Sequence, residues 1–257
     1  LTYFVALCFD MHRIGVNEEE KDKWIGYAEM LTPIVKAYCS DIGFRVTENA
    51  MQIYGGYGFC SEYPVEQFMR DEKIASIYEG ANGIQALDLI GRKLGMKKGT
   101  YFMNLLGLMG STVTKYKEIE GLKELGDAVQ ASVNVLADTA VYFASCGKAG
   151  KFLVPINNAY PFLMMMGKVV SGWFLFWQAG IAKEKLDVLV RQAGIKGLDS
   201  AAMSDLAKSS KDVAFYMGKI SSAQYFIRNV LPEVDAVVKA MKNEDMSIVE
   251  IPEESFA

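Results

Sequence analysis

The hydrophobic and polar positions along this chain predict helices almost throughout. Between Lys23 and Tyr54, large apolar residues recur at steps of three and four, which is the spacing of one helix face. The same spacing fills four later segments, residues 101–119, 122–145, 158–191 and 204–242. No stretch of useful length alternates apolar and polar residues as a half-buried strand does. The pattern therefore predicts an all-α fold.

Glycine and proline residues mark the joints between these helices. Gly55 and Gly56 are expected to end the first long helix, and Pro64 to begin a short one. Pro33 interrupts the long helix, because proline lacks an amide donor and clashes with the preceding turn. Either a kink forms there, or Thr32 caps a new helix with Pro33 at its first position.

A domain boundary is predicted near residues 95–100, where two lysines precede Gly99 as at a helix C-terminus. The chain then divides into a helical part at residues 1–97, a bundle of four long helices at 98–245 and an acidic tail at 246–257.

The segment from Ala159 to Ile181 is apolar and long enough to span a bilayer. Lys168 lies at its middle, and its pattern continues into an amphipathic segment. A helix that is apolar all round is more often the buried centre of a bundle. We therefore interpret it as a core helix and expect no membrane partner.

Composition narrows the kinds of function that this chain can have. It has 257 residues, 51% of them hydrophobic, and a formal net charge of -4 without a Lys/Arg-rich run, which argues against a nucleic-acid partner. Its single histidine, His12, and four dispersed cysteines supply neither a usual zinc site nor a Ser-His-Asp triad. We expect no metal, and free thiols in a reducing compartment. The apolar start lacks a basic segment and an initiating Met, so we interpret it as the end of a helix from a longer chain.

The stretch from Met51 to Leu94 holds most of the candidate chemistry. Three of its glycines, at positions 55, 56 and 58, form an elbow that another molecule could approach closely. Glu79 follows two apolar residues and precedes Gly80. Asn82 and Gln85 have the spacing of a capping box, so Glu79 is expected in the loop just before a helix. By local pattern alone, Glu79 is either a general base or a carboxylate that caps or pairs at this loop.

Five ordered blocks in this stretch carry a family resemblance. They are Gln52-x-x-Gly55-Gly56-x-Gly58, Glu62-Tyr63-Pro64-Val65-Glu66, Arg70-Asp71-x-Lys73-Ile74, Ile77-Tyr78-Glu79-Gly80 and Ile84-Gln85. In this order they resemble the C-terminal domain of acyl-CoA dehydrogenases, FAD-dependent enzymes that desaturate acyl thioesters. The later helices resemble the added module of the longer branch that includes 3-methylmercaptopropionyl-CoA dehydrogenase. The resemblance implies the family's C-terminal helical bundle, followed by a second module like a four-helix bundle.

The resemblance also implies roles for particular residues. Glu79 would be the catalytic base that takes the α-proton of an acyl-CoA thioester, while a hydride passes to flavin N5. A carboxylate in an apolar pocket is a stronger base, and the residues around Glu79 suit such a pocket. Arg70 and Asp71 look like a structural pair. The implied cofactor-binding residues are Gln52, Gly55, Gly56, Gly80, Ala81 and Asn82, and the implied substrate-binding residues are Tyr78 and Gly80.

Within this set, Gln52, Gly55 and Gly56 would reach the ADP portion of FAD in a neighbouring subunit. Residues 80–82 would run beside the flavin. Ala81 stands where many members have Thr, so a hydroxyl contact to the flavin is not expected here. Tyr78 either lines the acyl pocket or only packs.

The implied partners are an acyl-CoA substrate, a second copy of the chain in a homo-oligomer, and electron-transfer flavoprotein as acceptor. The implied location is the bacterial cytoplasm or the mitochondrial matrix, in fatty acid metabolism. The family's N-terminal helical and middle β-domains are not in this sequence, so we expect this chain not to bind FAD alone. Two alternatives stay open, an acyl-CoA oxidase portion and a non-catalytic helical oligomerisation module.

Overall fold

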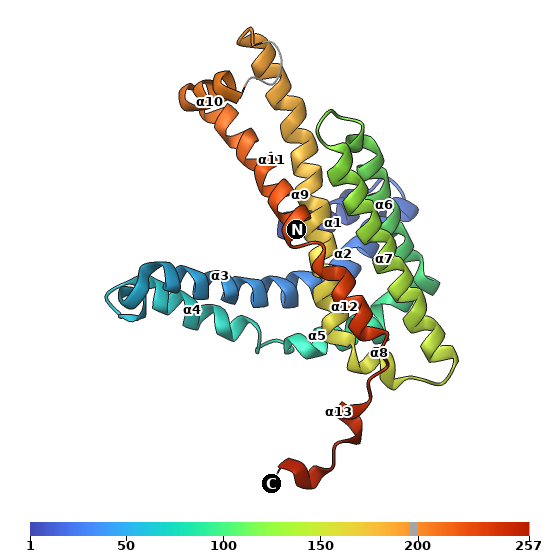
Figure 1. The fold of residues 1–257 in the computed structure, drawn as a ribbon. Helices are drawn as coiled ribbons and strands as arrows, with labels where there is room; N and C mark the ends of the chain where they lie inside the picture. The colour runs from blue at the N-terminus through green and yellow to red at the C-terminus, as the bar shows by residue number, and fades with distance from the viewer. Residues whose placement is uncertain (196–199, 257) are drawn as a thin grey trace. The chain divides into compact units, whose positions relative to one another are not determined.

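The computed structural model describes residues 1–195 and 200–256, and within them every regular element is a helix (Figure 1). The all-α prediction is therefore confirmed for the described residues. The α-helices are α1 (Thr2–Ile14), α2 (Glu18–Pro33), α3 (Cys39–Tyr54), α4 (Pro64–Ala75), α5 (Asn82–Gly91), α6 (Thr100–Lys117), α7 (Lys123–Lys148), α8 (Leu153–Asn157), α9 (Ala159–Gln192), α10 (Ser200–Ser209), α11 (Lys211–Asn229), α12 (Glu233–Met241) and α13 (Ser247–Glu250). A π-helical turn, η1 (Ile34–Tyr38), and three 3₁₀ segments, η2 (Gly55–Phe59), η3 (Lys93–Gly99) and η4 (Glu253–Phe256), complete the order.

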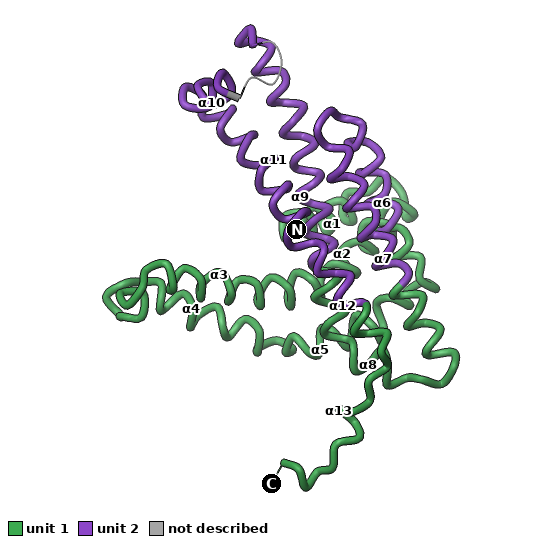
Figure 2. The backbone as a smooth tube through the Cα atoms, in the orientation of Figure 1, with its two compact units in different colours: residues 1–105, 139–167, 239–257 green, residues 106–138, 168–238 purple. Residues whose placement is uncertain are grey.

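The chain forms two compact units that interleave along the sequence (Figure 2). Unit 1 comprises Leu1–Leu105, Thr139–Gly167 and Lys239–Ala257, and unit 2 comprises Leu106–Asp138 and Lys168–Val238. Helices α6, α7, α9 and α12 therefore contribute residues to both units. The domain ranges predicted from the sequence, 1–97, 98–245 and 246–257, stay a prediction.

In unit 1, α1 packs against α2 and buries Cys8, Tyr27 and Leu31. Helices α3 and α4 lie side by side as a hairpin that projects from the rest of the unit (Figure 1). The hairpin turns at η2, because α3 ends at Tyr54 and Gly55 takes a positive φ of 63°. Pro64 begins α4 at its first position, as predicted.

Of the two alternatives at Pro33, a new helix capped by Thr32 is wrong. The helix continues from α2 through η1 into α3 without a new N-cap. Thr32 does not cap, because its Oγ1 donates to the carbonyl of Ala28 at 2.7 Å. Proline cannot donate to the carbonyl four residues back, and the chain accommodates this with the wider π turn that follows.

In unit 2, glycines let helices approach closely. A Cβ added at Gly180 would lie 2.3 Å from the ring of Tyr116, and one at Gly126 would lie 3.0 Å from the ring of Phe176. The single helix predicted over residues 204–242 is wrong, since three helices, α10 to α12, cover this region. Ser210 starts α11 because its side chain accepts from the amide of Val213.

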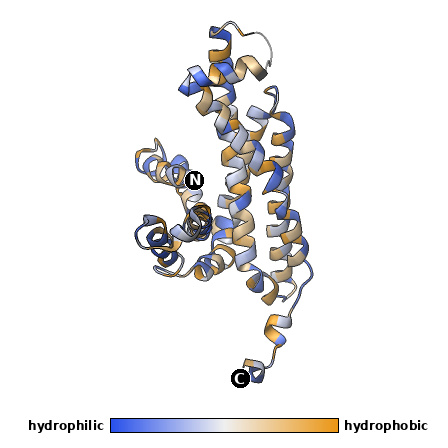
Figure 3. Ribbon diagram, turned by 60° about the vertical axis from the view of Figure 1, so that its left-hand side comes forward, coloured by the Kyte–Doolittle hydropathy of each residue, from blue (hydrophilic) through white to orange (hydrophobic). Residues whose placement is uncertain are grey.

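The apolar segment predicted as a core helix is α9. By length and composition it could cross a membrane, but 61% of its most apolar window is buried in the protein. Phe162 and Phe176 are fully buried, each against residues of its own unit. The core-helix interpretation is therefore confirmed. Hydrophobic and hydrophilic residues are interleaved along the described helices (Figure 3).

Candidate functional site

Glu79 lies in the loop between α4 and α5, as the sequence predicts. Glu79 and Gly80 both have positive φ angles, 52° and 90°, so the backbone makes a left-handed turn there. The predicted capping box is wrong, because α5 begins at Asn82 with Ala81 as its N-cap and without a side-chain cap. The side chain of Asn82 does not cap α5, because its amide group bonds to residues of η1 and α3.

Asn82 is 6% exposed, and its side chain reaches across to η1 and the first turn of α3. Its Nδ2 donates to the carbonyl of Ala37 at 3.2 Å and to Ser40 Oγ at 2.9 Å. Its Oδ1 accepts from Lys36 Nζ at 2.8 Å. The predicted flavin contact of Asn82 stays a prediction, and its side-chain amide already has three partners within the chain.

A cavity of about 260 Å³ opens beside this turn. Burial raises the pKa of the Cys39 thiol, which therefore stays protonated near neutral pH. The lining also contains Glu72 and Glu79, and their side chains are the candidate bases. The cavity is lined by Val35, Lys36, Cys39, Ser40, Glu72, Ala75, Tyr78 and Glu79.

The apolar, dehydrated pocket expected around Glu79 is not formed by the described residues of this chain. Glu79 is exposed, and its apolar neighbours Ile77 and Tyr78 are themselves 56% and 51% exposed. Local sequence placed these residues together correctly, but no element of the described chain covers them. Tyr78 lines the cavity and is half exposed, so it is available for contact with another molecule.

The glycine elbow lies at the other end of the hairpin. Gln52, Gly55 and Gly56 are exposed, and a Cβ added at either of these glycines would meet no atom within 4 Å. Gly58 differs, because a Cβ there would lie 2.5 Å from the carbonyl of Met51. The twelve residues of α4 separate the elbow from the Glu79 turn by about 18 Å, at 1.5 Å per residue. The structure thus brings residues 78–82 together and keeps Gln52, Gly55 and Gly56 apart from them.

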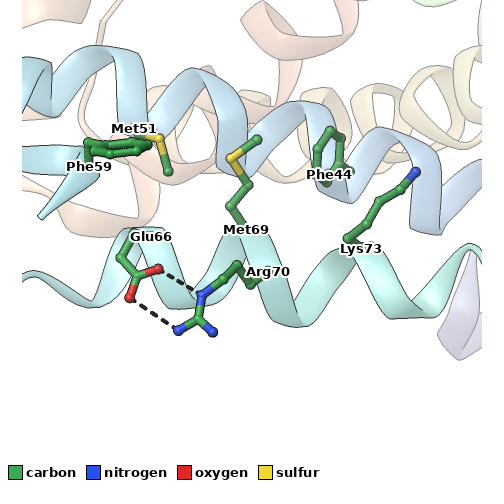
Figure 4. Close-up of a pocket in the computed structure, with 7 residues that line it drawn as sticks. All are labelled: Phe44, Met51, Phe59, Glu66, Met69, Arg70 and Lys73. Atoms are coloured by element: carbon green, nitrogen blue, oxygen red, sulfur yellow. Dashed lines mark hydrogen bonds and ion pairs between the residues drawn. The ribbon is translucent and has the colours of Figure 1, made fainter. Parts of the chain in front are cut away.

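A second cavity, of about 420 Å³, lies between α3 and α4 (Figure 4). Arg70 pairs there with Glu66 through bonds of 2.8 and 3.2 Å, whereas the sequence suggested Asp71 as its partner. Spacing explains the difference, because residues four apart on a helix lie on the same face. None of the predicted site residues lines this cavity, which is formed by Phe44, Met51, Phe59, Glu66, Met69, Arg70 and Lys73.

Sequence reasoning did not single out Lys36, Ser40 or Glu72. Lys36 and Ser40 are four residues apart, which places them on one helix face toward the loop. That spacing was the available signal, but it does not identify a partner more than forty residues away. Among residues 1–195 and 200–256, no group of three or more His, Cys, Asp or Glu could hold a metal ion.

Two family models match separate stretches of the chain. Residues 11–95 match the family described as acyl-CoA dehydrogenase, C-terminal domain. Residues 105–252 match the family described as acetyl-CoA dehydrogenase C-terminal like. All the residues of the Glu79 turn, the glycine elbow and the Asn82 contacts lie in the first match.

Curated relatives and a solved structure agree with these matches. A butyryl-CoA dehydrogenase of Syntrophomonas wolfei is 31% identical over 100% of this chain, which spans 39% of that protein. A 3-methylmercaptopropionyl-CoA dehydrogenase of Ruegeria pomeroyi is 34% identical over 85% of this chain and 34% of its own length. Caenorhabditis elegans ACDH-11, solved in complex with C11-CoA, has a similar fold, with a TM-score of 0.59 at 18% identity over 69% of this chain and 29% of its own.

Proposed function

Because this chain belongs to the acyl-CoA dehydrogenase family, we propose that it is the C-terminal portion of an FAD-dependent enzyme that desaturates an acyl-CoA thioester between its α and β carbons. The observation that carries the proposal is Glu79, an exposed carboxylate in a left-handed turn at the edge of a cavity. The relatives are named dehydrogenases, which favours this function over an oxidase or a non-catalytic module.

Glu79 acts in this proposal as the base for the α-proton. That proton is weakly acidic, so the base needs an environment in which a carboxylate is poorly hydrated. Glu79 and Tyr78 are exposed in the chain, so a bound acyl group and protein outside this chain could cover them. The proton moves to the carboxylate, and the β-hydrogen leaves with its electron pair. FAD, when bound, supplies the acceptor of that hydride.

The exposed backbone of the glycine elbow suits one side of an FAD site. Gly55 and Gly56 expose backbone that a phosphate group can approach, and the Gln52 amide lies in the last turn of α3. We assign these residues to the ADP portion of an FAD held mainly by a neighbouring copy, which makes the enzyme a homo-oligomer. Residues 80–82 would lie along the flavin with their backbone, because the side chain of Asn82 bonds within the chain.

Electron-transfer flavoprotein is the proposed electron acceptor. The four cysteines, Cys8, Cys39, Cys60 and Cys146, are free thiols, which supports a reducing location such as the bacterial cytoplasm or the mitochondrial matrix.

The test is Glu79→Gln in the intact enzyme, because Gln keeps the size and hydrogen bonding of Glu but is not basic. Anaerobic bleaching of the flavin by acyl-CoA should slow by about 10²–10⁴-fold, while acyl-CoA still binds. Glu79→Asp should retain part of the rate. Glu48→Gln, an exposed carboxylate on α3, is the matched control and should bleach at the unaltered rate. Unchanged bleaching in Glu79→Gln would place the base elsewhere and leave Glu79 structural.

A further inference from the structure

We propose that Asn82 is a positioning residue for the turn that carries Glu79, and that it acts by fixing this turn to the π-helical segment η1 and the start of α3. This role rests on the proposed function of Glu79 as the base. Asn82 would serve the reaction through its contacts inside the chain, without touching the reacting atoms.

The Glu79 turn needs an external constraint. A positive φ is disfavoured for a residue with a Cβ, so Glu79 does not adopt its φ of 52° by its own preference. Packing of the Glu79 side chain does not hold the turn either, because this side chain is exposed. The conformation must come from the residues at the two ends of the turn.

Hydrogen bonds close the turn at both ends. On the α4 side, the amides of Ile77 and Tyr78 donate to the carbonyl of Ile74 at 3.0 and 3.1 Å. On the α5 side, the backbone amide of Asn82 donates to the carbonyl of Ser76 at 3.1 Å. Asn82 therefore closes the loop with its backbone and also carries the side chain that binds the neighbouring helix.

The side-chain contacts of Asn82 use the full donor capacity of an amide. Both Nδ2 hydrogens have partners, the carbonyl of Ala37 and Ser40 Oγ, and Oδ1 accepts from Lys36 Nζ. Ser40 Oγ in turn donates to the carbonyl of Ala37 at 3.1 Å. A carboxylate at position 82 could keep the Lys36 contact but could not donate to the other two groups. The contact set is therefore specific to an amide of this length.

The same residues join this network to the cavity beside Glu79. Lys36 and Ser40 each bond Asn82 and also line the cavity with Glu79. They lie at the π turn and directly after it, and π turns within long helices are frequent at functional sites. Loss of the Asn82 contacts would let the Glu79 turn move relative to that wall. A displacement of about 1 Å can cost about 10²-fold in rate.

The experiment compares four variants in the intact enzyme: Asn82→Ala, Asn82→Asp, Ser40→Ala and Asn158→Ala. Asn158 is the matched control, because its Nδ2 makes one internal bond, to the carbonyl of Val154 at 2.9 Å, at the start of α9. Three quantities are measured for each, namely bound FAD, the dissociation constant of acyl-CoA, and the rate of anaerobic flavin reduction per bound FAD at saturating acyl-CoA.

Asn82→Ala and Asn82→Asp should slow reduction by about 10²-fold with FAD content and acyl-CoA affinity unchanged. Ser40→Ala, which removes one partner, should slow it less, and Asn158→Ala should not slow it. An unaltered rate per bound FAD in both Asn82 variants would overturn the positioning role. Loss of FAD with an unaltered rate in the molecules that retain it would also overturn it, and would assign Asn82 to the flavin contact. If Asn82→Ala does not fold, Asn82→Asp and Ser40→Ala decide by the same criteria.

Amide hydrogen exchange on the chain itself gives an independent readout. The backbone amide at position 82 should lose protection in Asn82→Ala and keep it in Asn158→Ala. Unaltered protection in both variants would overturn the contact between Asn82 and η1. Failure of the proposed function looks different, because Glu79→Gln would then reduce flavin at the unaltered rate whatever the Asn82 variants show.

Discussion

The α3–α4 hairpin and helix α9 differ in how far their apolar residues are buried. Along α3 the buried residue is Ser40, and along α4 it is Val65, while Ile53 and Phe59 are 85% and 82% exposed. Along α9 most of the apolar residues from Phe162 to Phe176 are buried. Both regions have helical periodicity, so the periodicity predicts the helix but not what covers it.

The difference indicates which part of the chain depends on other protein. A helix whose apolar face is already buried is complete within this chain, as α9 is. A hairpin with exposed apolar side chains gains stability only when another surface covers it. The predicted site residues lie at the two ends of this hairpin, which agrees with a site completed from outside the chain.

The largest expected contrast is in hydrogen exchange of the chain alone. Amides of α9 between Phe162 and Phe176 should exchange only through global unfolding, whereas those of α3 and α4 should exchange through local opening. The apparent opening free energies should differ by roughly 5 kcal/mol, since local openings span the range from near zero to the global value. Exchange monitored by mass spectrometry or NMR measures this, and equal protection of both regions would remove the contrast.

Matched phenylalanine truncations test the same contrast through stability. Phe162→Ala should lower the free energy of unfolding by about 3–5 kcal/mol, because Phe162 is fully buried and packs on Phe143 with ring centroids 5.4 Å apart. Phe59→Ala should change it by less than about 0.5 kcal/mol. Urea titration followed by circular dichroism measures both. A large loss in Phe59→Ala would show that the hairpin is already well packed.

Glycine substitutions give the smallest expected effects. In Gly180→Ala the new methyl group meets the buried ring of Tyr116, so unfolding should become easier by about 1–3 kcal/mol. In Gly56→Ala it meets no atom within 4 Å, and stability should change by less than about 0.5 kcal/mol.

In the intact enzyme, Gly56→Leu should nonetheless lower FAD retention and assembly together. Retention of both would show that the elbow is only a turn.

Much of the fold and part of the candidate site could be predicted from the sequence. The helices around Gly55, Pro64 and Glu79 follow from residues within one or two turns of each position, so local rules suffice there. The joint at Ser210 was missed because a serine within an apolar pattern fits a helix interior as well as a cap. The exposure of Glu79 could not be predicted either, since apolar neighbours in sequence do not guarantee an apolar enclosure in space.

By itself the sequence determined the helical class, the elbow at Gly55, the loop position of Glu79 and the family of the chain. Only the tertiary structure decided that Asn82 binds Lys36, Ala37 and Ser40, across separations of 46, 45 and 42 residues. The physical reason is range. Backbone preferences and helix-face spacing depend on residues only a few positions apart. They do not determine whether a polar side chain caps its own helix or bonds to a distant one. Its actual partners are chosen only when distant helices pack and bury it, because a buried amide must then find every hydrogen bond within reach.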